Sequence, residues 1–149
     1  MQKKTKIVLL AAFTLVAIAG VVIWDVPLNK AALIWERPTI EQTARAYLEA
    51  EMERNLEKVY AFLAPSSPYR KTHDYQEFLQ DVGNSPKKIS TYRIVDIYRL
   101  RDNDNRENYP LVDKFVQVEV DITFANTGEN STYNYCFTFL KEKGVWYKG

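Results

Sequence analysis

The longest apolar run in the sequence lies near its N-terminus. Three lysines precede the 18 uncharged residues from Ile7 to Trp24, and Asp25 ends the run. At about 1.5 Å per residue such a helix is roughly 27 Å long, close to the thickness of a bilayer's hydrocarbon core. Because lysines stay on the cytoplasmic side, the pattern predicts a cytoplasmic stub (residues 1–6) and a single transmembrane anchor (residues 7–24). The expected localisation is the cytoplasmic membrane, with the remaining chain facing the periplasm or the cell exterior.

A cleaved signal peptide is the alternative interpretation of the same segment. Residues 17–19 (Ala-Ile-Ala) fit the small-x-small pattern of a cleavage site. The apolar run continues past this site to Trp24, which favours an uncleaved anchor. Both interpretations export the rest of the chain. Residues 25–38 follow as a predicted linker, since Pro27 and Pro38 bracket them.

Helical periodicity begins at residue 39. Thr39 and Gln42 have the spacing of a capping box, which satisfies free amides at a helix start. Asn55 is a candidate second N-cap that divides the helical run in two. Asp74 and Glu77 predict another capped helix, closed by a glycine at position 83. The first run places apolar residues on one face at three- and four-residue spacing: Ala44, Tyr47, Leu48, Met52, Leu56, Val59, Tyr60 and Leu63.

In the C-terminal half the hydrophobic period changes from 3.6 to 2, which indicates strands. Residues 89–101 predict a long strand, residues 102–108 a polar loop, and residues 112–124 a strand in which apolar positions alternate with polar ones. A hairpin loop at 126–130 leads to a third strand, and residues 145–147 form a last one. The third strand places four aromatic side chains on one face: Tyr133, Tyr135, Phe137 and Phe139. Helices followed by antiparallel strands predict an α+β domain over residues 39–149, with the helices packed on a curved sheet.

Two stretches of sequence and the order of elements resemble a known superfamily. The stretches are NLEKVYAFLAP (residues 55–65) and FTFLKEKGVWYKG (residues 137–149). They are similar to the membrane-anchored bacterial branch of the nuclear-transport-factor-2-like superfamily. This branch includes the N-terminal non-catalytic domain of certain penicillin-binding transpeptidases and small envelope proteins. The resemblance implies a cone-shaped, cystatin-like sheet behind one transmembrane helix.

Composition excludes several kinds of site and partner. The chain has 20 basic and 19 acidic residues, and the part beyond residue 24 has 17 basic and 19 acidic ones. A near-neutral exported part argues against nucleic acid as a partner. Cys136 is the only cysteine and His73 the only histidine, so a disulfide within the chain and multi-cysteine or multi-histidine metal sites are excluded. We therefore predict no cofactor and no metal.

One acidic residue is a candidate for chemistry inside the cone. Asp96 shares strand parity with the apolar positions of residues 89–101, so an inward carboxylate there has a raised pKa and can act as a base. Some members of the superfamily are isomerases or dehydratases that use such a carboxylate. Tyr47 and Tyr60, on the apolar helix face, are further candidates to line a ligand pocket.

The sequence shows no complete catalytic set, and so we predict a non-enzymatic protein. The leading prediction is a protein-interaction or scaffold module of the bacterial envelope, held at the membrane by Ile7–Trp24 and docked on an extracytoplasmic or membrane protein. Tyr133 and Tyr135 are its candidate interaction face, because tyrosines are enriched in protein interfaces. The alternatives are the binding of a small apolar ligand, or an isomerase- or dehydratase-like activity, in the cone cavity.

Overall fold

A computed structural model describes residues 31–83, 85, 87–125 and 132–149. The chain divides into two compact units between Trp35 and Glu36, and residues 31–35 of the first unit are helical. The predicted stub, the anchor at 7–24 and residues 25–30 of the predicted linker lie outside the described residues. Within the described ranges, no helix has the length and apolar character needed to cross a membrane.

The long helix of the second unit (residues 36–53) begins earlier than the capping box predicts. Residues 31–38 are helical, so the described part of the predicted linker is wrong, and Thr39 is not an N-cap. Tertiary contacts explain the difference: Arg37 forms an ion pair with Asp96 at 3.0 Å, and Glu36 pairs with Lys114 at 3.2 Å. These contacts hold the turn before Pro38 in a helical conformation, and context of this kind overrides local propensity.

The long helix ends in a Schellman motif. The Asn55 amide donates to the Ala50 carbonyl at 2.9 Å and the Arg54 amide to the Glu51 carbonyl at 3.2 Å. Arg54 occupies the left-handed position (φ 57°), where glycine is usual. Asn55 then caps helix α2 (Leu56–Phe62) by accepting from the Lys58 amide at 3.1 Å. The predicted division of the helical run at Asn55 is confirmed.

Two short helices follow. Helix α3 (Pro68–Thr72) has Ser67 as its N-cap and Pro68 in its first turn, and the sequence pattern did not predict it. Helix α4 (Tyr75–Val82) begins with the predicted capping box of Asp74 and Glu77, which is confirmed. The segment before α3 is fixed to the sheet, since the buried Glu142 carboxylate accepts from both the amide and the hydroxyl of Ser66.

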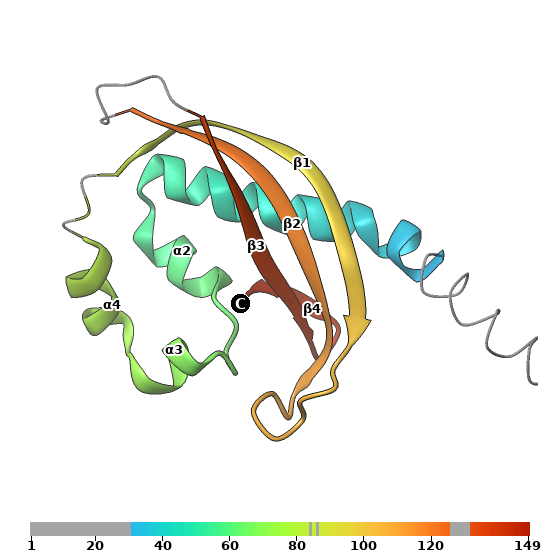
Figure 1. The fold of residues 1–149 in the computed structure, drawn as a ribbon. Coiled ribbons are helices and arrows are strands. Elements are labelled where there is room, and N and C mark those ends of the chain that lie inside the picture. The colour runs from blue at the N-terminus through green and yellow to red at the C-terminus, as the bar shows by residue number, and fades with distance from the viewer. Residues whose placement is uncertain (1–30, 84, 86, 126–131) are drawn as a thin grey trace, which may run out of the picture. The chain divides into compact units, whose positions relative to one another are not determined.

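The strands form one antiparallel sheet in the order β1-β2-β3-β4, which confirms the α+β prediction. The long strands arch over the helices (Figure 1), and three register shifts interrupt the pairing of β1 with β2. A two-residue turn with positive φ at Lys143 and Gly144 joins the last two strands. The strands are β1 (Ile89–Asp102), β2 (Val112–Phe124), β3 (Thr132–Glu142) and β4 (Val145–Lys148).

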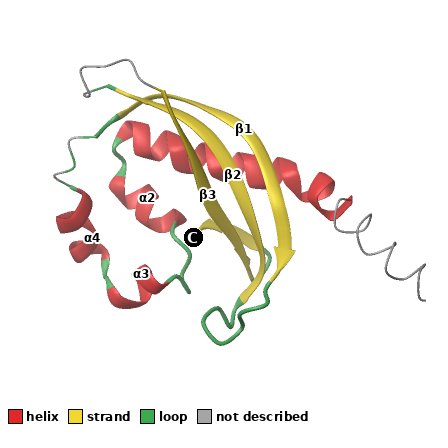
Figure 2. Cartoon of the chain, in the orientation of Figure 1, coloured by secondary structure: helices red, strands yellow, loops and turns green. Residues whose placement is uncertain are grey.

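The core lies between the long helix and one face of the sheet. The long helix runs across the strands (Figure 2), with Arg37 at β1 and the Tyr47 ring 6.3 Å from Phe139 on β3. Apolar side chains from both layers are almost completely buried there, as the alternating pattern predicts: Ile40, Ala44, Leu48, Val116, Val118, Val120, Ile122 and Phe139.

Candidate functional site

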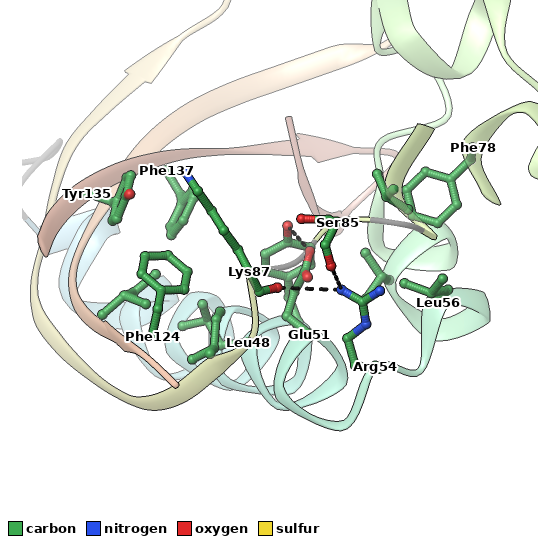
Figure 3. Close-up of a pocket in the computed structure, with 15 residues that line it drawn as sticks. Leu48, Glu51, Arg54, Leu56, Phe78, Ser85, Lys87, Phe124, Tyr135 and Phe137 are labelled. Atoms are coloured by element: carbon green, nitrogen blue, oxygen red, sulfur yellow. Dashed lines mark hydrogen bonds between the residues drawn. The ribbon is translucent and has the colours of Figure 1, made fainter. Parts of the chain in front are cut away.

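A cavity of about 280 Å³ lies between the helices and the sheet. Figure 3 shows side chains from the long helix, α4, the segment before β1, and the strands β2 and β3 converging on it. Most of the lining is apolar or aromatic, which is the usual character of small-molecule sites. The cavity is lined by Tyr47, Leu48, Glu51, Arg54, Leu56, Val59, Phe78, Val82, Ser85, Lys87, Ile89, Ile122, Phe124, Tyr135 and Phe137.

Aromatic rings form one end of the cavity. Tyr135 and Phe137 stack at 5.9 Å between ring centroids, and Phe124 meets Tyr135 edge-on at 6.2 Å. Tyr47 reaches the same group from the long helix, with its ring 6.3 Å from Phe137. The strands supply these rings because alternate residues of β3 face the helices. The result is a rigid apolar surface that can hold the body of a ligand.

A hydrogen-bonded pair introduces polarity into this lining. The Tyr47 hydroxyl donates to the Glu51 carboxylate oxygen Oε1 at 2.8 Å. Burial, and then the neighbouring Glu51 carboxylate, raises the pKa of Tyr47 well above its usual value. Tyr47 therefore stays protonated and acts as a hydrogen-bond donor to Glu51. The sequence predicted Tyr47 as a pocket residue, and the structure places it in the lining.

Arg54 bonds to the segment between α4 and β1, from which Ser85 and Lys87 line the cavity. Its guanidinium donates to the backbone carbonyl oxygens of Gly83 at 2.8 Å, Ser85 at 3.2 Å and Lys87 at 3.5 Å. These bonds connect the end of the long helix to a segment about 30 residues further along the chain. The unusual left-handed conformation of Arg54 thus coincides with a structural role for its side chain.

Two lysines lie beside the aromatic end. The Lys87 ammonium is 5.9 Å from the centre of the Phe124 ring, and the Lys148 ammonium is 5.8 Å from that of Phe137. Burial lowers the pKa of Lys148, and the negative charge of Glu51 partly opposes this shift. Within the described ranges, no carboxylate lies within ion-pair distance of Lys87. Among the charged residues of the lining, Arg54 and Lys87 outnumber Glu51, so the lining has a net positive charge.

Asp96 does not lie in the cavity, and its predicted inward position is wrong. A β-bulge between Ile94 and Asp96 shifts the register with β2 and reverses the parity of the strand. The carboxylate is half-exposed; it accepts from the Ile97 amide at 2.8 Å and from Arg37 at 3.0 Å. The Ile97 hydrogen bond, and next the Arg37 guanidinium, lower the pKa of Asp96 instead of raising it. Asp96 therefore lacks the features predicted for a base inside the cone.

The other candidate tyrosines have separate positions. Tyr60 is half-buried outside the cavity lining; its hydroxyl donates to the His73 carbonyl at 3.0 Å, and its ring lies 5.2 Å from Phe78. Tyr133 is 42% exposed, near the end of β3. Tyr135 lines the cavity, and both tyrosines of the predicted interaction face pack against Phe124, with ring centroids 6.0 and 6.2 Å from it.

The single histidine and the single cysteine lie in separate surroundings. His73 stacks on Tyr69 with 4.3 Å between ring centroids, after the end of α3. Cys136 is exposed on the opposite face of β3 from Phe137, with its sulfur 2.9 Å from the Tyr98 hydroxyl. Among the described residues, no group of three or more potential ligands could hold a metal ion.

Sequence reasoning missed the polar part of the cavity. In the sequence, Glu51 and Arg54 resemble ordinary charged residues at the end of an amphipathic helix, and Lys87 lies in a segment without hydrophobic periodicity. The position of Arg54 directly before the Asn55 cap was a usable signal, because a helix that ends there needs a left-handed residue. No signal in the sequence links Lys87 to the rings of β3.

Comparison with known proteins gives no match: no family model matches the chain, and neither does any curated protein.

Proposed function

We propose that the domain is a non-enzymatic binding module that holds a small, mainly apolar molecule in the cavity behind β2 and β3. The observation that carries this proposal is the cavity itself, about 280 Å³ of space with an aromatic lining. At about 30 Å³ per water molecule, the space equals roughly nine waters, enough for a ligand of similar atom count. An apolar molecule of this size gains affinity mainly from burial.

The position of Tyr135 favours a ligand over a docked protein. A tyrosine that serves a protein interface presents its ring to solvent, whereas Tyr135 is half-buried and stacks with Phe137 in the lining. Tyr133 alone is a small exposed surface. Docking on an extracytoplasmic protein, predicted from the sequence, has no comparable feature to support it among the described residues.

The wider setting of the domain is part of the same proposal. Helices followed by a four-stranded antiparallel sheet support a cone-shaped sheet of the nuclear-transport-factor-2-like kind. The charge-free run from Ile7 to Trp24 supports an anchor in the cytoplasmic membrane. An anchored, exported domain of this kind would capture its ligand on the outer side of that membrane.

A neutral fluorescent probe of apolar sites, such as Nile red, tests the binding function. The whole chain in lipid nanodiscs should enhance the probe's fluorescence above that of empty nanodiscs. Val82→Trp fills the cavity from α4 and should abolish the enhancement, whereas Val145→Trp adds the same bulk at an exposed position outside the lining and should not. Circular dichroism checks that both variants fold. Equal binding by the two folded variants would exclude the cavity as the site.

A further inference from the structure

We propose that the ligand is an amphipathic anion: an apolar chain in the cavity with one acidic head group bound by Lys87. This inference rests on the proposed binding function and adds the chemical class of the ligand. The head group would lie at the aromatic end, and the apolar part would extend along the aliphatic lining from Leu56 and Val59.

The direction of the Lys87 side chain is the first argument. An exposed lysine in a loop normally extends into water, where its ammonium is best solvated. Figure 3 shows the Lys87 side chain extended across the cavity toward Phe137, and its ammonium lies 5.9 Å from the Phe124 ring. The ammonium of the exposed Lys87 therefore lies beside the space that a ligand would occupy, where it can donate up to three hydrogen bonds to an anionic head group.

The balance of charge is the second argument. Two cationic side chains, Arg54 and Lys87, line the cavity and a third, Lys148, lies beside Phe137, against the single lining carboxylate of Glu51. The Glu51 carboxylate already accepts a hydrogen bond from Tyr47, and its negative charge also acts on Lys148, whose pKa it raises. A ligand with one negative charge reduces the excess of positive charge, whereas a cationic ligand increases it.

The backbone before β1 is the third argument. Arg54 holds the carbonyl groups of Gly83 at 2.8 Å and Ser85 at 3.2 Å, which fixes the main chain just before Lys87. A binding group on a fixed main chain loses less entropy when it engages a ligand. Arg54 is thus a positioning residue for Lys87, because its guanidinium is occupied by these carbonyls.

Three probes of one chain length test the charge of the head group. Octanoate, octan-1-ol and octylamine should displace Nile red from the chain in phosphatidylcholine nanodiscs at pH 7.5, with empty nanodiscs as the blank. We expect octanoate to bind about threefold to fivefold more tightly than octanol, as for an ion pair at an exposed lysine, and octylamine to bind most weakly. Each methylene removed from octanoate should weaken binding about fourfold.

Lys87→Met removes the charge and keeps the length of the side chain. The affinity for octanoate should fall to within about twofold of that for octanol, and the affinity for octanol should stay unchanged, since only the ionic contact is lost. Lys88→Met is the matched control, an exposed neighbour outside the lining, and should retain the preference for octanoate. High salt should reduce the preference of the wild-type chain for octanoate over octanol, because it screens the charge of Lys87.

The outcomes separate this inference from the proposed function. Equal affinity for octanoate and octanol, or tightest binding of octylamine, would overturn the anionic head group while the cavity remained a binding site. Loss of the preference in Lys88→Met as much as in Lys87→Met would overturn the role of Lys87. Failure of the wild-type chain to bind Nile red itself would instead contradict the proposed function.

Discussion

Arg54 affects stability in two opposing ways, and its replacement by alanine and by glycine separates them. Its left-handed backbone (φ 57°) costs a residue with a Cβ atom roughly 1–2 kcal/mol. Its guanidinium donates to Gly83 at 2.8 Å and to Ser85 at 3.2 Å, whereas the 3.5 Å contact with Lys87 is too long to contribute much. Hydrogen bonds from charged donors contribute about 1.5–3 kcal/mol when buried. Because the Arg54 side chain is partly exposed, its two shorter hydrogen bonds together contribute about 2 kcal/mol.

Arg54→Ala should therefore lower the free energy of unfolding by about 2 kcal/mol, because the hydrogen bonds are lost and the backbone strain stays. Arg54→Gly loses the same hydrogen bonds but removes the backbone strain. Because glycine also has more conformational freedom to lose on folding, the net relief is about 1 kcal/mol. The net loss for glycine is then about 1 kcal/mol. For a domain of this size the melting temperature should fall by about 8 °C for alanine and about 4 °C for glycine.

Urea unfolding of the chain in nanodiscs, followed by tryptophan fluorescence, measures these differences; Trp146 is almost fully buried and reports on the packing of β4. Arg45→Ala is the matched control, because Arg45 lies on the exposed face of the same helix and pairs with Glu41 at 2.7 Å. Its loss should cost less than about 0.5 kcal/mol. A glycine variant no more stable than the alanine variant would refute the argument about strain. An alanine variant as stable as wild type would refute the role of the guanidinium.

Three further predictions concern single contacts. Asp96→Asn should lower the free energy of unfolding at neutral pH, because the ionised Asp96 with its depressed pKa stabilises the fold there. Wild type loses this stabilisation as the pH falls below about 4, so the variant should lose less stability over that range. An unchanged acid-unfolding profile would contradict this. Ser66→Ala should cost about 1.5–3 kcal/mol in urea unfolding, since the buried Glu142 carboxylate loses the hydroxyl donor; a neutral effect would show that the Ser66 amide suffices. Asp74→Ala should cost about 1 kcal/mol by removing the N-cap of α4, and amide exchange in α4 should rise with it; unchanged exchange would argue against the cap.

The strands could be predicted well from the sequence because alternation is a direct signal of a half-buried sheet. Residues 112–124 alternate between buried and partly exposed positions almost throughout β2, and the turn at Lys143 and Gly144 has residues suited to a tight hairpin. The position of Asp96 could not be predicted in this way. A single bulge before it reverses the parity of the strand, and no residue in that stretch marks a bulge.

The helical part and the site show where local patterns fail. The capping box at Thr39 is chemically sound, yet the ion pairs of Glu36 and Arg37 with the sheet extend the helix past it. These contacts join residues about 60 to 80 positions apart in sequence, so no local window contains them. The cavity has the same origin, because Glu51, Lys87 and Tyr135 come from three separate elements.

The break in the helical run at Arg54 links the stability of the domain to its cavity. A continuous helix through residues 54 and 55 would keep the apolar face of α2 in line with the long helix. The left-handed turn at Arg54 instead redirects the chain, and the cavity lies beside this break, lined by Arg54 and by Leu56 of α2. Because the cavity is partly open to solvent, the cost of empty apolar volume sealed in a core, about 24 cal/mol per Å³, does not apply to it in full. A ligand that fills the space restores the missing contacts, so occupancy of the cavity should stabilise the fold.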